Sequence, residues 1–478
     1  MRSKRWIGPL WLLLSSGVFV LWGVILQHNS QGEMPDLKAV YYGARCLIRH
    51  TDPYQESEFL RVYLAEGGKI PTDHRIAEMF SRAVPVCINL PTTLLIVAPL
   101  ALMAWGPAHV LWIVLVAGSL IIAAFLVWDL ARGHSPAVSL LLICMVLANS
   151  EVLIELGNTA GISVGLCIIA VWCFFKERFV PAGIVCLAVS LAIKPHDAGL
   201  VWLYFVLAGG AFRRRGLQAL AVTAALCLPA VLWVSSAAPY WMQELHSNLA
   251  TASVHGGLND PGPASIGSSG ADMIVDLQSS VSVLRDDPRF YNPTSYMVCG
   301  ALLIVWAAVT LKARWSPQRA WFALAAIAAL SMLPVYHRQH DAKLLLLTVP
   351  ACAMLWAAGG TVRWIALTLN LAAVVLTGDI PTAILYIFTG GPHAVQSGIL
   401  EKSMTIVLMR PSSVVLLFLS VFYLVVYARH CREQLAWPRC GWLFATPLSE
   451  PVGLHIVRSL NSREFKSRTS DGRVDFPN

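Results

Sequence analysis

The sequence predicts an all-α membrane protein that crosses the bilayer many times, and three observations support this. Apolar residues make up 56% of the 478 residues and charged residues only 13%, about half the charged share of a soluble domain. Uncharged apolar runs, such as residues 6–26 and 108–128, are long enough to cross a hydrocarbon core of roughly 30 Å. Because lipid offers no partner for an unpaired peptide group, and these runs exceed the roughly 10 residues of a barrel strand, they must form helices.

The basic loops between the apolar runs indicate the topology. They order the runs into about twelve spans, within a range of ten to thirteen, with both chain ends in the cytoplasm. The net charge of +8 is spread over these short loops, so it reflects topology and not nucleic-acid binding. The N-terminal run is expected to be an uncleaved anchor. The expected spans are residues 6–27, 108–128, 136–150, 158–175, 180–193, 197–212, 216–235, 294–311, 320–335, 343–358, 364–378 and 411–428.

The remaining segments fall outside the expected spans. Residues 91–105 are short and begin with a proline, so we expect a re-entrant or half-buried segment there, and residues 380–409 stay unassigned. Two loops, residues 28–88 and 236–293, are expected to face outward and to carry short helices. A membrane domain over residues 1–428 is then followed by a polar cytoplasmic tail over residues 429–478.

The first outward loop places a carboxylate at the edge of the bilayer. Asp36 opens a segment with apolar residues at helical spacing, which suits a helix lying on the membrane surface. Enzymes that act on lipid-carried substrates need a base at this level, although an aspartate here can also be a helix N-cap. Asp52 precedes a proline and indicates a turn or a helix stop.

A pair of acids follows the third expected span. Glu151 and Glu155 are four residues apart, so they share one face of a helix. Two such carboxylates can bind a cation or raise each other's pKa, but they are also typical of a solvated helix end. If the protein uses a divalent cation, we expect it at Glu151 and Glu155, and the sequence predicts no other cofactor.

Two basic runs lie at outward turns, where positive charges are disfavoured. They are Lys194-Pro195-His196-Asp197 and His337-Arg338-Gln339-His340-Asp341. A charge at the centre of a membrane helix costs on the order of 3 kcal/mol, so cations near the membrane in these places need a reason. Binding of an anionic headgroup supplies one. The alternatives are side chains that extend to the interface, or an internal pair such as Arg338 with Asp341.

Several common catalytic motifs are absent from the sequence. There is no Asp-x-Asp that could hold the metal of a nucleotide sugar, and no His-Glu-x-x-His, Gly-x-Ser-x-Gly or Walker motif. A cytosolic nucleotide substrate is therefore not expected.

Four motifs occur in a fixed order along roughly residues 1–360. They are Asp36-Leu37-Lys38-Ala39-Val40-Tyr41-Tyr42-Gly43-Ala44-Arg45 with Thr51-Asp52-Pro53-Tyr54, then Asn89-Leu90-Pro91, then Glu155-Leu156-Gly157-Asn158, and then Ala192-Ile193-Lys194-Pro195. In this order they resemble the bacterial family 87 glycosyltransferases of the GT-C superfamily. The best-known members of that family are polyprenol-phosphate-mannose-dependent α-1,2-mannosyltransferases.

The resemblance implies a GT-C fold in the bacterial inner membrane, with an active site that faces the periplasm. It also implies a polyprenyl-phosphate sugar donor, with mannose the best guess for the hexose or pentose, and a lipid or glycan acceptor. In an inverting displacement, Asp36 becomes the catalytic base. The expected ligands of the donor phosphate are Lys194, His196, His337, Arg338 and His340. The expected contacts to the acceptor or sugar are Tyr41, Tyr42, Asp52 and Asn158.

Two functions without catalysis remain as alternatives. A flippase for lipid-linked sugars, or a solute carrier, also needs many spans and buried charges. A non-catalytic assembly protein of the cell envelope is the other. The carboxylate that opens the outward loop favours the enzyme, and the lack of an internal repeat disfavours a carrier, because many carriers are built from repeated halves.

Overall fold

The computed structural model describes residues 7–30, 34–257, 259–262, 274–378 and 398–432. Residues 1–436 form one compact unit, and residues 437–478, a second unit, lie outside the described residues. Over the described ranges the chain is helical, and its extended pairing is one isolated bridge between Ile274 and Arg338. The predicted all-α fold is confirmed.

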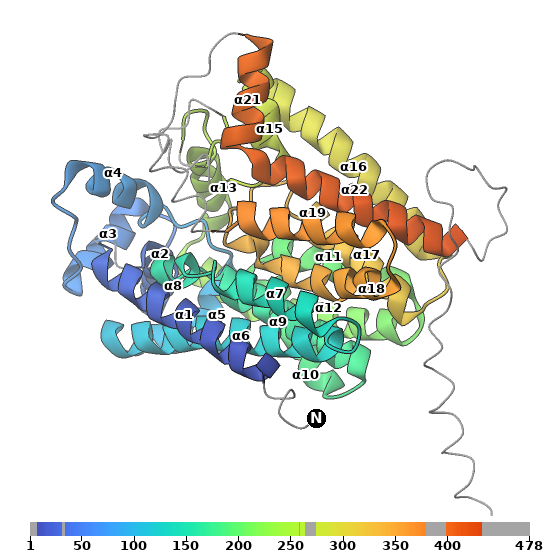
Figure 1. The fold of residues 1–478 in the computed structure, drawn as a ribbon. Coiled ribbons are helices and arrows are strands. Elements are labelled where there is room, and N and C mark those ends of the chain that lie inside the picture. Colours follow the sequence, from blue (N-terminus) through green and yellow to red (C-terminus); the bar gives the residue numbers. More distant parts are fainter. Residues whose placement is uncertain (1–6, 31–33, 258, 263–273, 379–397, 433–478) are drawn as a thin grey trace, which may run out of the picture. The chain divides into compact units, whose positions relative to one another are not determined.

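Figure 1 shows the helices of the described ranges. In chain order they are α1 (Ile7–Asn29), α2 (Pro35–Ile48), α3 (Glu56–Ala65), α4 (His74–Ala83), α5 (Pro91–Ala101), α6 (Trp105–Ala131), α7 (Pro136–Leu147), α8 (Val152–Leu156), α9 (Ala160–Lys176), α10 (Val180–Ile193), α11 (Pro195–Ala208), α12 (Gly210–Ala237), α13 (Trp241–Ala252), α15 (Leu277–Leu284), α16 (Pro288–Lys312), α17 (Pro317–Leu330), the 3₁₀ helix η2 (Asp341–Thr348), α18 (Val349–Ala358), α19 (Val362–Leu376), α21 (Ile399–Met409) and α22 (Pro411–Arg432). Within the compact unit, α6, α9 and α10 pack side by side, as do α17 and α22 (Figure 1).

Seven helical segments in the described ranges are long and apolar enough to cross a membrane. They are Ile7–Asn29, Trp105–Ala131, Pro136–Leu156, Gly210–Ala237, Pro288–Lys312, Asp341–Ala358 and Pro411–Arg432. Four more apolar helices, α5, α9, α10 and α19, have only 10–17 residues. Helices this short fall below the roughly 20 residues of a full span, so length alone does not establish the expected count of twelve.

Within the segment 91–105, residues Pro91–Ala101 form a short helix, and Trp105 already begins α6. Helix α5 has 11 residues, which corresponds to about 16 Å, roughly half of the hydrocarbon core. The second loop that was expected to face outward is shorter than predicted, because α16 already begins at Pro288. Asp287 caps this helix by accepting a hydrogen bond from the backbone N–H of Arg289.

The unassigned segment 380–409 and the predicted tail each lie partly outside the described residues. Of the unassigned segment 380–409, residues 380–397 lie outside the described residues, and α21 covers most of the remainder. The predicted tail begins within α22, which continues to Arg432, and the rest of the tail lies outside the described residues.

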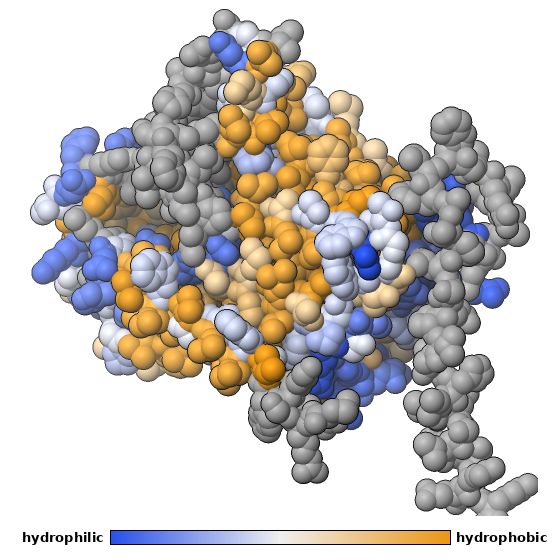
Figure 2. Space-filling model, viewed as in Figure 1, coloured by the Kyte–Doolittle hydropathy of each residue, from blue (hydrophilic) through white to orange (hydrophobic). Residues whose placement is uncertain are grey.

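Large apolar side chains lie on the surface of the long helices. Leu21 of α1, Leu232 of α12 and Ile304 of α16 are all exposed. Figure 2 shows hydrophobic residues over α19 and α22 and hydrophilic residues over α3 and α4. A broad apolar surface on helices of this length fits contact with lipid.

Helix α2 is packed inside the protein, which differs from the surface-lying helix that its amphipathic pattern suggested. Ten of its 14 residues are buried, including Lys38. It packs against α5, and a Cβ atom at Gly43 would lie 3.0 Å from Leu94 Cδ2, so the two helices approach closely there. Helix α2 also packs against α8.

Candidate active site

Asp36 is the second residue of α2, and its carboxylate makes a hydrogen bond outside this helix. The N-cap is Met34, which has a left-handed backbone with a φ of 57°, and Pro35 is the first helical residue. No side chain caps this helix end. Instead, Asp36 Oδ2 accepts a hydrogen bond of 2.6 Å from Asn158 Nδ2. The interpretation of Asp36 as an N-cap is therefore wrong, since its partner is a side chain from another part of the chain.

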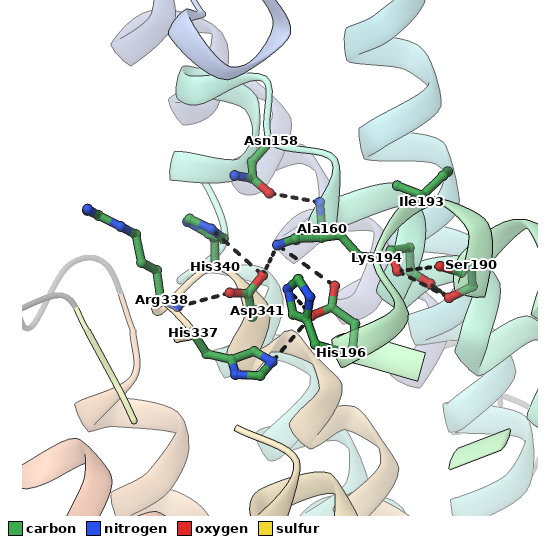
Figure 3. Close-up of polar contacts among 12 residues, drawn as sticks. Asn158, Ala160, Ser190, Ile193, Lys194, His196, His337, Arg338, His340 and Asp341 are labelled. Atoms are coloured by element: carbon green, nitrogen blue, oxygen red, sulfur yellow. Dashed lines mark hydrogen bonds and ion pairs between the residues drawn. The ribbon is translucent and has the colours of Figure 1, made fainter. Parts of the chain in front are cut away.

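Asn158 connects α2 to the start of α9. Its Oδ1 accepts a 2.8 Å hydrogen bond from the backbone N–H of Ala160, the first residue of α9 (Figure 3). Since Oδ1 is engaged by a donor and Nδ2 faces a carboxylate, only one orientation of the amide satisfies both contacts. Trp112 Nε1 also donates to the carbonyl of Gly157 at 2.8 Å, which fixes the turn before Asn158.

Gly157 makes the contact between this turn and α2 possible. Its φ is +65°, and a Cβ atom at this position would lie 2.8 Å from Leu37 Cβ. We expect Gly157→Ala to cost about 1–2 kcal/mol for the left-handed backbone and about 1–3 kcal/mol more for overpacking. It should also separate Asp36 from Asn158.

Thermal unfolding measures this effect, together with the rate of the sugar transfer that the resemblance to family 87 implies. Gly17→Ala in α1 is the matched control, because a Cβ atom there would have no neighbour within 4 Å. If Gly157→Ala behaves like Gly17→Ala in both measurements, the turn does not position Asp36.

Lys194 lies between α10 and α11, at a place set by α5. Thr92 Oγ1 and Thr93 Oγ1 donate to the carbonyls of Ala192 and Ile193 at 2.5 Å and 3.1 Å. These bonds satisfy the last carbonyls of α10 and hold the chain just before Lys194. The Asn89-Leu90-Pro91 motif thus helps to position this lysine, because it leads into the first turn of α5.

Lys194 and Arg338 converge on one carboxylate, that of Asp341 (Figure 3). The Lys194 ammonium pairs with Asp341 Oδ1, and the backbone N–H of Arg338 donates to Asp341 Oδ2 at 2.9 Å. The expected pairing of Arg338 with Asp341 thus runs through the backbone. The Arg338 guanidinium donates to Tyr336 Oη and, at 3.3 Å, to Asn259 Oδ1.

Arg338 and Lys194 both act on Asp36. Desolvation is the largest effect and raises the pKa of Asp36, while the hydrogen bond from Asn158 and the charges of Arg338 and Lys194 lower it. The net pKa of Asp36 lies above its ordinary value. A carboxylate with a raised pKa is a stronger base and remains ionised more easily beside cations than alone, which suits a proton acceptor.

The three histidines of the two basic runs are not cations near neutral pH. Desolvation and the charge of Lys194 lower the pKa of the partly exposed His196 to about 4, and burial lowers the pKa of His340 to about 3 and also that of His337. Of the five residues expected to bind the donor phosphate, only Lys194 and Arg338 therefore supply positive charge.

Tyr41 and Tyr42 belong to the packed interior. Tyr41 is 1% exposed, and its hydroxyl donates to the carbonyl of Met103 at 2.7 Å. Tyr42 is 4% exposed, and its ring lies 5.9 Å from that of Trp105 and 4.9 Å from that of Tyr63 between centroids. Neither ring is open to a sugar, so we do not retain them as acceptor contacts.

Asp52 forms a turn and contacts a different part of the chain. Its Oδ1 accepts a 2.8 Å hydrogen bond from the backbone N–H of Tyr54, and Tyr54 Oη donates to the carbonyl of Asn89 at 2.9 Å. Burial and the neighbouring carboxylate of Glu244 raise the pKa of Asp52. These contacts fit the turn predicted from the sequence.

The structure brings metal-ligating side chains together at a place other than Glu151 and Glu155. Glu151 is 3% exposed and directly precedes α8, and Glu155 is half-buried within α8. In the described ranges, the three side chains spaced for a metal ion are His196, Asp197 and His337. A cation at the two glutamates stays a prediction.

Sequence reasoning did not single out Asp197 or Asp341 as site residues. Both are buried, with 2% of their surface exposed, and both lie close to Lys194. A repeated pattern could have indicated them, because Lys194-Pro195-His196-Asp197 and Arg338-Gln339-His340-Asp341 share the order base, any residue, histidine, aspartate. Two like patterns in two distant segments suggest that both contribute to one site.

A comparison with protein families gives one match. The profile of glycosyltransferase family 87 matches residues 88–335, slightly more than half of the chain. No curated protein and no solved structure matches the chain. The matched range contains Asn158 and Lys194 but ends before Arg338 and begins after Asp36.

Proposed function

Because the chain belongs to glycosyltransferase family 87, we propose that it moves a sugar from a polyprenyl-phosphate donor to a lipid or glycan acceptor. The observation that carries this proposal is the desolvated carboxylate of Asp36, held by Asn158 within electrostatic reach of Lys194 and Arg338. In the proposed reaction, Asp36 takes up the proton that the acceptor hydroxyl loses. Lys194 and Arg338 offset the negative charge that develops on the departing phosphate. Mannose is the sugar that we expect.

The proposed reaction needs one carboxylate. Asp36 accepts the proton of the acceptor hydroxyl while that oxygen attacks the anomeric carbon, and the bond from this carbon to the phosphate oxygen breaks. The phosphate leaves with the bonding electrons. Lys194 and Arg338 stabilise its negative charge, so no general acid is required, in contrast with the two carboxylates of a glycosidase.

A cavity beside the site supports a donor carried on a lipid. It has a volume of about 280 Å³ and lies between α11, α16 and the end of α17. Apolar groups dominate its lining, and His196 lines it while also belonging to the polar cluster with Asp197 and His337. A prenyl chain in this cavity would bring its phosphate toward Pro195 and His196, which follow Lys194 directly in the chain.

The location follows from the same proposal. We expect the protein in a bacterial inner membrane, with the outward loops and Asp36 on the periplasmic face, where polyprenyl-phosphate sugars are available. The hydrophilic surface of α3 and α4 in the first of these loops agrees with exposure to water (Figure 2).

Purified protein offered a panel of donors tests the function. Polyprenyl-phosphate sugars, mannose first, and the matching nucleotide sugars are each incubated with membrane lipids, and glycosylated lipid is measured. We expect product from the lipid-phosphate donors alone. Product from nucleotide sugars alone would overturn the proposed donor.

A further inference from the structure

Three side chains with metal-binding atoms lie together beside, but outside, the pair of Asp36 and Asn158. His196 and Asp197 come from the first turn of α11, and His337 comes from the segment between α17 and η2. Their ligating atoms all lie within 4.8 Å of one another. His196 Nε2 and His337 Nε2 are each 3.7 Å from Asp197 Oδ1, and the two rings lie 4.9 Å apart between centroids (Figure 3).

Two of these side chains are buried and lack hydrogen-bond partners for the atoms concerned. His337 Nε2 and both Asp197 oxygens have no hydrogen bond of normal geometry, the Ser163 hydroxyl is a polar neighbour of the Asp197 carboxylate, and both side chains are 1% exposed. The distance of 3.7 Å is too long for a hydrogen bond between them. Lys194 Nζ is 3.9 Å from Asp197 Oδ2 and is engaged by Asp341. A buried carboxylate without a hydrogen bond of normal geometry is costly, so a ligand that binds it gains free energy.

The hydrogen bond of His337 Nδ1 fixes the tautomer of the imidazole ring. Nδ1 lies 2.8 Å from the backbone carbonyl of Val335, which can only accept, so Nδ1 carries the proton. In the neutral ring, Nε2 then presents a lone pair toward the Asp197 carboxylate, and two acceptors face each other. Histidine ligands of metals commonly donate their second N–H to a backbone carbonyl in this way.

We propose that His196, Asp197 and His337 bind one divalent transition-metal ion, with Zn²⁺ as the preferred ion. Two imidazole nitrogens and one carboxylate oxygen form a donor set that suits zinc and leaves a fourth position open. The partly exposed His196 faces the apolar cavity, so an ion here can be reached from it. Resting on the proposed function, the open position accepts an oxygen of the donor phosphate.

Metal binding is measured on the full-length protein after treatment with a chelator. Zn²⁺ alone is titrated by calorimetry, with bound zinc measured by mass spectrometry, and we expect one ion per chain. His196→Ala should weaken binding at least roughly 100-fold, more than the loss of an outer-shell partner. Its side chain is 36% exposed, so this variant should fold. His337→Ala should have the same effect.

His246→Ala, on the exposed surface of α13, is the matched control and should bind zinc as the unchanged protein does. Mg²⁺ should neither bind nor raise the melting temperature. The site is overturned if the unchanged protein binds no zinc, or if His196→Ala and His246→Ala bind it equally. Because zinc binding is read without sugar transfer, a failed donor assay leaves this result standing, and the reverse also holds.

Discussion

Asp36→Asn should strongly reduce sugar transfer while the protein stays folded. An amide cannot accept the proton of the acceptor hydroxyl, so the rate should fall by roughly 10²–10⁴-fold, the usual contribution of a general base. Folding should survive because Asn Oδ1 can still accept the hydrogen bond from Asn158 Nδ2, and the variant removes a charge that is costly to desolvate. The measurement is transfer rate per folded protein, with the melting temperature recorded alongside.

Asp52→Asn is the matched control for this variant. It brings the same chemical change to the same loop, and its Oδ1 can still accept the hydrogen bond from the Tyr54 N–H, so activity and stability should stay nearly unchanged. If Asp36→Asn keeps full activity, Asp36 is not the base, and Glu151 and Glu155 become the next candidates.

Lys194→Gln should weaken donor binding, and it should also lower stability. A charge-assisted contact to phosphate contributes about 1.5–3 kcal/mol, which corresponds to a roughly 10- to 150-fold weaker donor affinity. The lost lysine also leaves the buried Asp341 carboxylate without its partner, at a cost of about 3–5 kcal/mol. Donor titrations and thermal unfolding measure the two effects separately.

The double variant Lys194→Gln with Asp341→Asn separates the two roles. It removes the unpaired carboxylate, and Asn Oδ1 can still accept from the Arg338 N–H, so stability should largely return. Donor affinity should stay low. If affinity returns together with stability, Lys194 acts only by holding the structure.

The pH profile of Lys194→Gln gives a further readout. The base must be deprotonated, so the rate falls as the pH drops through the pKa of Asp36. The charge of Lys194 lowers that pKa, and its loss should therefore move the acidic limb of the residual activity to higher pH. An unchanged limb would mean that Lys194 does not act on the catalytic base.

The helices were largely predictable from the sequence, because apolar runs long enough to span a bilayer strongly indicate helices. The expected spans at residues 6–27 and 411–428 correspond to α1 and α22. Helix lengths were less predictable, because α9 and α10, with 17 and 14 residues, are packed on other helices and need not match the bilayer. The surface position expected for α2 was wrong, since an amphipathic pattern does not distinguish a lipid surface from a protein surface.

The candidate site was predictable only in part. Asp36, Asn158, Lys194 and Arg338 were all expected from the sequence, yet the hydrogen bond between Asp36 and Asn158 depends on a close approach at Gly157 that spacing does not show. Histidines were expected to bind phosphate as cations, but burial keeps them neutral, and burial is a property of the packed fold. Tyr41 and Tyr42 proved to be core residues for the same reason.

The anomeric configuration of the product tests the central claim most directly, which is that one carboxylate drives a direct displacement of the lipid phosphate. A donor of known configuration is converted by the unchanged protein, and the new glycosidic bond is assigned by nuclear magnetic resonance coupling constants. A single displacement promoted by Asp36 gives a product of inverted configuration. A product of retained configuration would contradict this account, because it requires a second displacement by a nucleophile.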